Sequence, residues 1–145
     1  MEEIIIDQPI RVFYIEARSF PQGILEAHQS LHSLLSGVAG RKFYGISCKN
    51  KSGEIIYKAA TEEQTPGEAE KYGCDIFTIK KGLYLSKTLY NWSSQEGLIS
   101  TTFQELLTDD RLDPNGYCLE IYPNDKDIQC LVKLRDIDIH DEIIK

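Results

Sequence analysis

The sequence predicts an α+β fold in which two pseudo-symmetric β-α-β-β half-units share one antiparallel sheet, with two main helices on one face and a central cleft. Three observations support this prediction. The order strand, helix, strand, strand occurs twice along the 145 residues. The expected strands are short and rich in β-branched and aromatic residues. Each expected helix has its apolar residues at helical spacing.

The first half-unit spans approximately residues 9–60. A strand is expected at 11–17 (RVFYIEA), and apolar residues between Ile24 and Leu35 then recur at helical spacing. Strands expected at 42–49 and 54–60 flank a turn-forming Asn-Lys-Ser-Gly sequence, which predicts a hairpin. The polar residues 61–71, which include Pro66-Gly67, are expected to form a linker or exposed crossing loop.

The second half-unit spans approximately residues 75–135 and repeats the same order. Residues 75–88 are expected to be extended, with a kink at Gly82. A capping-box pattern from Ser93 to Glu96 predicts the start of a helix, and apolar residues between Leu98 and Leu107 supply its stripe. Strands are expected at 117–122 and 128–134, separated by a Pro-Asn-Asp turn.

The two half-units align by order and spacing more than by identity. Phe13-Tyr14-Ile15 matches Leu83-Tyr84-Leu85, and Gly45-Ile46 aligns with Glu120-Ile121. Residues 1–145 are therefore expected to form a single ligand-binding domain. A cleft is expected where the half-units meet, since small-molecule sites form at such junctions.

The composition disfavours several functions. Acidic residues outnumber basic ones by 23 to 16, a net charge of −7, which argues against direct nucleic-acid binding. No apolar run is long enough to cross a membrane, and the N-terminus is acidic where a secretory signal would be basic, so a cytoplasmic location is expected. The four cysteines are far apart in the sequence, and no metal or cofactor is expected.

Glu120 is the most unusual residue of the expected strands. It lies between Leu119 and Ile121 in an apolar segment, where a buried carboxylate is costly unless it is paired. Side chains alternate across a strand, so Glu120 shares a face with Cys118 and Tyr122. Leu119 and Ile121 would face the helix-covered core. Glu120 could then lie in a cleft on the other face, or be solvated on an open sheet face.

Aromatic residues flank both expected helices. Phe20 lies before the first and Trp92 before the second, and either could line a cleft or close the end of the core. A carboxylate surrounded by aromatic faces suits a lipophilic cation, because the rings attract the cation and the carboxylate neutralises it. His28 and His32 have the spacing of two metal ligands, but no third ligand is evident and a polar helix flank is the simpler interpretation.

The sequence FTIKKGLYLSK at 77–87, followed by an expected helix and then CLEIYPND at 118–125, resembles the GyrI-like small-molecule-binding family. This family includes gyrase-inhibitor-like proteins and the effector-binding domains of AraC-type and multidrug-responsive transcription regulators. Its pattern is roughly FTIPAGxYAVF, then F-E-I-Y followed by N-D. FYGIS at 43–47 matches more weakly. Lys80-Lys81 replace the usual Pro-Ala, and Lys87 replaces an apolar residue.

This resemblance implies two β-α-β-β half-units around a central ligand cleft. In drug-binding members of the family, a glutamate of the E-I-Y strand contacts cationic aromatic ligands, and Glu120 occupies that position. Tyr122 matches as well. Trp92 lies where the family often has an aromatic residue in a G-P-Y-like loop, although the loop here reads NWSSQ.

The leading hypothesis is a stand-alone effector-binding or drug-sequestering protein of the cytoplasm, too short to include a DNA-binding domain. Its ligand is expected to be a lipophilic, cationic or aromatic small molecule. Glu120 would be the charge partner, and Tyr122, Trp92, Phe20 and Tyr84 would offer stacking surface.

Two alternatives belong to other functional classes. Some stand-alone members of the family look like hydrolases of strained cyclopropane-containing natural products. The same glutamate could act as a general base there, with Glu16, Glu96 or a tyrosine hydroxyl as the second polar group. The chain could instead be a protein-interaction module, such as a topoisomerase inhibitor or the partner of a separate regulator.

Overall fold

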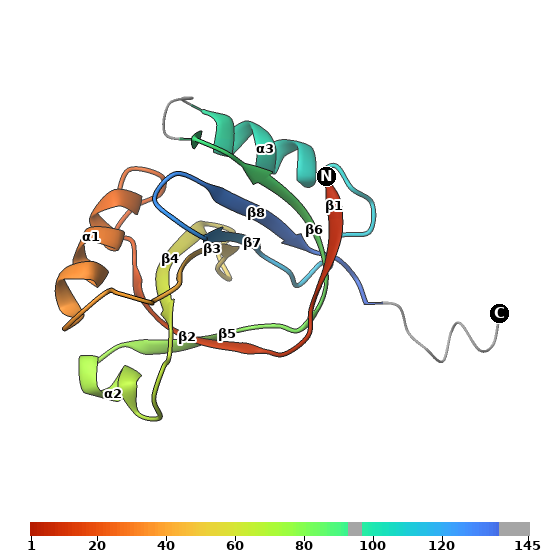
Figure 1. Ribbon diagram of the computed structural model, residues 1–145. Coiled ribbons are helices and arrows are strands. Elements are labelled where there is room, and N and C mark those ends of the chain that lie inside the picture. Colours follow the sequence, from red (N-terminus) through yellow and green to blue (C-terminus); the bar gives the residue numbers. More distant parts are fainter. Residues whose placement is uncertain (93–96, 137–145) are drawn as a thin grey trace.

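The computed structural model describes residues 1–92 and 97–136, which form eight strands and three helices (Figure 1). The helices are α1 (Ile24–Leu34), α2 (Glu68–Tyr72) and α3 (Leu98–Leu106). The strands are β1 (Glu2–Ile6), β2 (Ile10–Glu16), β3 (Phe43–Lys49), β4 (Ile55–Glu62), β5 (Asp75–Ile79), β6 (Gly82–Leu89), β7 (Cys118–Tyr122) and β8 (Ile128–Lys133).

All eight strands belong to one antiparallel sheet in the order β1-β6-β8-β7-β3-β4-β2-β5. The half-units β2-α1-β3-β4 and β6-α3-β7-β8 lie side by side, which confirms the predicted repeat. They meet where β3 pairs with β7, at the centre of the sheet. Gly45 and Glu120, which align in the repeat, are direct partners in this central pair.

Helices α1 and α3 pack on the same face of the sheet, one over each half-unit (Figure 1). Helix α1 buries Ala27 and Leu31, and α3 buries Leu106. We call the two resulting groups the α1 cluster and the α3 cluster. The buried residues of the α1 cluster are Phe13, Ala27, Leu31, Leu35, Tyr57, Ala59 and Ala69. Those of the α3 cluster are Leu85, Leu89, Leu106, Ile128, Cys130, Val132 and Leu134.

The other face of the sheet is also buried, because the sheet curls around it (Figure 1). This inner cluster contains Val12, Tyr44, Ile46, Ala60, Ile79, Tyr84, Tyr117, Leu119 and Leu131. Leu119 and Ile121 belong to it, so the expectation that they face the helices was wrong. Glu120 instead lies on the helix-bearing face. A curled sheet needs apolar residues on both faces, so an apolar face does not identify the side that the helices cover.

Three local expectations also differ from the structure. Residues 75–88 form two strands, β5 and β6, which are interrupted at Lys80-Lys81. The polar segment after β4 contains the short helix α2, which starts after Gly67 in a left-handed conformation. The N-terminal strand β1 was not predicted; it pairs with β6 at one edge of the sheet. The capping-box residues Ser93 to Glu96 lie outside the described residues.

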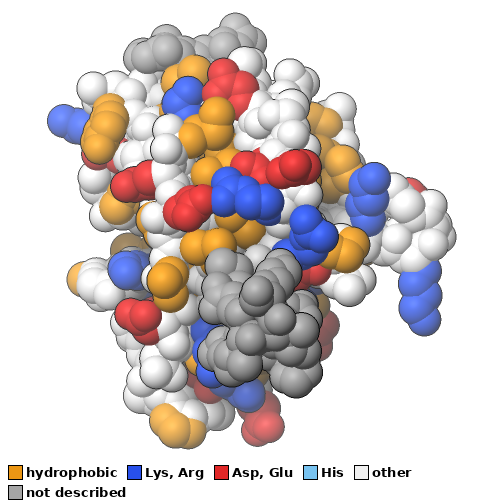
Figure 2. Space-filling view, turned by 90° about the vertical axis from the view of Figure 1, so that its right-hand side faces the viewer, with side chains coloured by type: hydrophobic (Ala, Val, Ile, Leu, Met, Phe, Trp, Pro, Cys, Tyr) orange, Lys and Arg blue, Asp and Glu red, His pale blue; other side chains and the backbone are white. Residues whose placement is uncertain are grey.

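Charged side chains of both signs mix with hydrophobic ones on the face seen from the β1 side (Figure 2). Arg111 pairs with Glu3, on β1, and with Asp109. Among the helices of residues 1–92 and 97–136, none has the length and apolar character needed to cross a membrane.

Candidate functional site

Glu120 lies in the middle of β7, between the α1 and α3 clusters, with only 8% of its surface exposed. Its neighbours across the sheet are Gly45 on β3 and Cys130 on β8. Cys118 and Tyr122, two residues away on either side, share its face and pack with the α3 cluster. The glutamate is therefore placed at the junction of the half-units, within an otherwise apolar layer.

Two tyrosine hydroxyls hold the Glu120 carboxyl group. Tyr57, on β4, donates a hydrogen bond to Oε1 over 2.6 Å, and Tyr122 donates to the same oxygen over 2.8 Å. Oε2 accepts no hydrogen bond from the residues that the structure describes. Both tyrosine hydroxyls thus donate to one oxygen of the carboxyl group.

Gly45 makes the meeting of Tyr57 and Glu120 possible. Tyr57 lies on the far side of β3 from Glu120, so its ring must pass over β3 to reach the carboxyl group. A Cβ atom on Gly45 would lie 2.1 Å from Glu120 Oε1 and 2.1 Å from the Tyr57 hydroxyl. The absence of a side chain on β3 at this position is therefore required by the hydrogen bond.

His28 extends the network toward α1. Its Nε2 atom lies 2.8 Å from the Tyr57 hydroxyl oxygen. The single hydroxyl proton of Tyr57 is donated to Glu120, so His28 must donate to Tyr57 and carry its proton on Nε2. Burial, followed by the proximity of His32, lowers the pKa of His28 to about 4, so the ring is neutral near pH 7.

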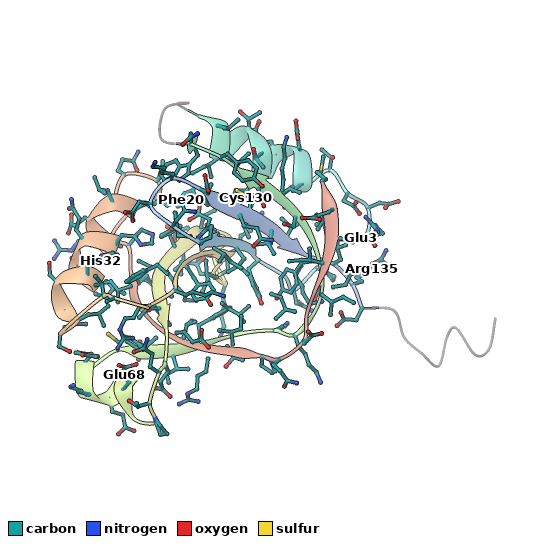
Figure 3. All side chains as sticks on the ribbon, in the orientation of Figure 1. Glu3, Phe20, His32, Glu68, Cys130 and Arg135 are labelled. Carbon is teal, nitrogen blue, oxygen red and sulfur yellow. The ribbon has the colours of Figure 1, made fainter. Side chains whose placement is uncertain are left out.

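Aromatic rings enclose this network. Phe20 stacks on Tyr57 with ring centroids 6.3 Å apart. His28 and Tyr122 meet edge to face, with ring centroids 5.5 Å apart. On the α3 side, the ring centroid of Trp92 lies 6.4 Å from that of Tyr122. Phe20 and Cys130 are labelled on the helix-bearing side of the central strands in Figure 3. Phe20 is the most open of these rings, at 39% exposed.

The Glu120 carboxyl group is buried without a positive partner among the residues described. Burial raises its pKa, and the hydrogen bonds from Tyr57 and Tyr122 offset only part of that effect. Burial also raises the pKa of both tyrosines, and raises that of Cys118 to about 11 and that of Cys130 to about 12. The neighbouring Tyr57, Tyr122, Cys118 and Cys130 side chains are therefore neutral near pH 7.

The structure brings four of the five predicted site residues together. Glu120, Tyr122, Trp92 and Phe20 belong to one group at the junction. Tyr84 does not, because it lies in the inner cluster on the opposite face of the sheet. Its hydroxyl donates to Lys80 O over 2.7 Å and lies 2.7 Å from the Tyr117 hydroxyl.

Sequence reasoning missed Tyr57, His28 and Gly45 as parts of this group. Tyr57 lies in a strand where aromatic residues are ordinary, so its contact with Glu120, 63 positions later, leaves no local signal. The His28/His32 pair was considered as a metal site, but the two rings diverge: His32 stacks on Phe43 at 4.1 Å. The alignment of Gly45 with Glu120 in the repeat was the one usable indication.

Glu120 is almost completely buried. A groove of about 740 Å³ adjoins it along the sheet: Cys118 and Ser47, which line the groove, are two residues away from Glu120 and Gly45 on the same face. Glu120 itself does not line this groove.

No protein-family model matches the chain, and a search of curated proteins found no match either. Several solved structures share its fold, and they include the following two. The integron cassette protein VCH_CASS2, from the mobile metagenome of Vibrio cholerae, has a TM-score of 0.66, with 92% of this chain and 95% of that chain covered. SAV2435, in a structure bound to tetraphenylphosphonium, has a TM-score of 0.67, with 93% and 94% covered. Both are 11% identical to this chain, so the likeness shows a common fold.

Proposed function

We propose that this protein is a GyrI-like small-molecule-binding domain whose ligand is a lipophilic cation that pairs with Glu120. The single observation that carries the proposal is a buried carboxyl group with no positive partner in the described structure. Such a group is costly unless something balances it, and a cation from outside would do so.

The surroundings of Glu120 favour a cation with an aromatic or apolar body. Tyr57 and Tyr122 bond to the carboxyl group, Phe20 stacks on Tyr57 and Trp92 packs near Tyr122. Aromatic faces attract cations. Among the proteins that share this fold, SAV2435 has been solved with tetraphenylphosphonium bound, which is a lipophilic aromatic cation. This likeness supports the choice of ligand class.

Binding requires side chains to move, because Glu120 is 8% exposed in the structure. Phe20 stacks on the ring of Tyr57, whose hydroxyl is bonded to Glu120, and Phe20 is itself partly open to solvent. We therefore expect the cation to enter by displacing Phe20 and rotating Tyr57, while Tyr122 keeps its bond to Oε1.

Calorimetric titration with tetraphenylphosphonium tests the proposal. Glu120→Gln keeps the shape of the side chain and an oxygen that can accept both tyrosine hydroxyls, but removes the charge. We expect it to weaken binding at least about thirtyfold, the effect of about 2 kcal/mol, because a buried charge would lose its partner. Glu54→Gln, in the exposed β3–β4 turn, is the matched control and should bind like the parent.

Tetraphenylborate provides a control on the ligand side, since it has the same shape with the opposite charge. It should bind much more weakly than the cation. Equal binding of tetraphenylphosphonium by the parent and by Glu120→Gln would refute the charge pairing.

A hydrolase is the second candidate, because the His28–Tyr57–Glu120 chain supplies the second polar group that such chemistry needs. Of the other residues that the sequence suggested for that group, Glu16 is exposed at the end of β2 and Glu96 lies outside the described residues. Water would form a C–O bond as the strained C–C bond breaks. Glu120 would accept one proton from the water, and Tyr57 would give one to the carbon that keeps the electron pair. Tyr57 would then regain its proton from Glu120 along their hydrogen bond.

Product analysis with a cyclopropane-containing DNA-alkylating compound separates the two candidates. A hydrolase gives ring-opened product in excess over protein, and Tyr57→Phe slows its formation. A binding protein protects at most one equivalent of the compound. A protein partner and a cytoplasmic location remain predictions from the sequence.

A further inference from the structure

The groove next to the Glu120 site has the dimensions of a separate binding site. Its volume is about 740 Å³, within the usual range for small-molecule sites. It lies where β3 ends and β7 begins, between the segment 107–117 and the β3–β4 hairpin. Of the residues placed around Glu120, neither Tyr57, Tyr122, Trp92 nor Phe20 lines it.

The groove has apolar walls that are open to solvent. Leu107 and Ile55, which line it, are 48% and 46% exposed, although both are large hydrophobic residues. Phe77 and Leu112 also line the groove and are partly buried. Apolar surface that is gathered in a concavity favours a ligand with an apolar body.

One wall is held rigidly. The Tyr117 hydroxyl accepts a hydrogen bond from the Lys80 backbone N–H over 2.8 Å and lies 2.7 Å from the Tyr84 hydroxyl. The Tyr117 ring meets the Phe77 ring edge to face at 5.2 Å. A wall fixed in this way loses little conformational freedom when a ligand binds.

Most of the charged residues that line the groove are positive, although the whole chain has a net charge of −7. Lys49 and Lys80 line it, are exposed, and form no ion pair with any residue that the structure describes. The pKa of Asp136 is lowered mainly by its hydrogen bond from Lys133 Nζ, over 2.9 Å, and Lys80 adds only a small effect. Asp113 is the acidic residue among the lining groups.

We propose that this groove binds an amphipathic organic anion, whose apolar body lies against Phe77, Leu107 and Leu112 and whose carboxylate or sulfonate pairs with Lys49 and Lys80. Two unpaired lysines beside an apolar concavity are complementary to such a molecule. The site is distinct from the Glu120 site and takes the opposite charge, so it goes beyond the function proposed above.

Fluorescence titration of the full chain with 8-anilinonaphthalene-1-sulfonate tests this inference. We expect saturable binding that the double substitution Lys49→Gln and Lys80→Gln weakens by about threefold to tenfold, the size expected of partly exposed charge pairs. Lys126→Gln, on the exposed β7–β8 turn at the other end of β7, removes the same charge and should leave binding unchanged. Leu107→Glu, on the exposed rim, should weaken binding more strongly.

Competition identifies the chemistry of the ligand. Octanoate should displace the probe at lower concentration than 1-octanol, because only octanoate offers an anion to the lysines. Equal displacement by the two, or an unchanged affinity in the double lysine variant, would overturn the proposal. Loss of probe binding in Glu120→Gln would also overturn it, since the probe would then occupy the aromatic site.

Discussion

Glu120 is buried like a core residue although its side chain carries an ionisable carboxyl group. Its carboxyl group is bonded to two tyrosine hydroxyls and is surrounded by groups that are neutral near pH 7. Hydroxyl donors stabilise a carboxylate less than a cation would, so its pKa remains raised. We therefore expect ionisation of Glu120 to be coupled to binding of the proposed cation.

This coupling predicts a pH dependence of cation binding. The cation prefers ionised Glu120, whose pKa in the ligand-free protein is raised above the ordinary 4.5. Affinity for tetraphenylphosphonium should rise with pH up to that raised pKa and level off above it, with release of a proton on binding below it. Titrations at several pH values, in buffers of different ionisation enthalpy, measure both effects.

Glu120→Gln should remove this pH dependence together with most of the affinity.

The stability of the parent protein without ligand should depend on pH in the opposite sense from cation binding. It should fall as pH rises. The folded chain holds the Glu120 proton more tightly than the unfolded chain does, so this contribution is fully present below pH 4.5 and is lost as pH rises through the raised pKa. A cation affinity that is independent of pH in the parent would contradict the coupling.

At the scale of elements, the site depends on three neighbouring strands and one helix. Strand β7 supplies Glu120, β4 supplies Tyr57, and β3 lies between them with a glycine at the crossing point. Helix α1 supplies His28. Its Nε2 atom donates a hydrogen bond to the Tyr57 hydroxyl, which in turn donates to Glu120. The register of β3 against β7 is therefore as important to the site as the residues that form it.

Gly45→Ala tests this dependence on register. The added Cβ would lie 2.1 Å from both Glu120 Oε1 and the Tyr57 hydroxyl, so one of them must move. We expect a loss of about 1–3 kcal/mol in the free energy of unfolding, as for other overpacked sites, and weaker cation binding. Urea denaturation measures the first effect and calorimetry the second.

Gly37→Ala is the control for this substitution. A Cβ at Gly37 meets nothing within 4 Å, and its backbone is not in the left-handed region. Its stability and binding should match those of the parent. If Gly45→Ala also behaved like the parent, the close approach at β3 would have no energetic role.

At the scale of the whole molecule, the curled sheet separates two buried faces. One face carries both helices and Glu120, and the other encloses the inner cluster with Tyr84 and Tyr117. Substitutions on the inner face should therefore affect stability without reaching the cation site.

Tyr84→Phe tests this separation. The substitution removes the hydroxyl that donates to Lys80 O and that accepts the Tyr117 hydroxyl proton, while Tyr117 keeps the hydrogen bond from Lys80 N–H. We expect a loss of about 1–3 kcal/mol in the free energy of unfolding. The affinity for tetraphenylphosphonium should stay the same. A large drop in that affinity, with the fold retained, would show that the two faces are coupled.

Local sequence patterns were sufficient for most of the fold. Apolar spacing predicted α1 and α3, and turn residues predicted the β3–β4 and β7–β8 hairpins. The repeated order of elements predicted two half-units on one sheet. Strand β1 and helix α2 were missed, because one is a short edge strand and the other is five residues long in a polar segment. Their formation depends on partners that are distant in the sequence.

The sequence by itself determined that one glutamate stands within an apolar strand and that the chain repeats a β-α-β-β order. Only the tertiary structure decided which face Glu120 occupies, and that Tyr57 and His28 reach it while Tyr84 does not. The physical reason is that alternation along a strand divides residues between two faces without saying which face the helices cover. In a curled sheet both faces are apolar, so only the packing of α1 and α3 distinguishes them.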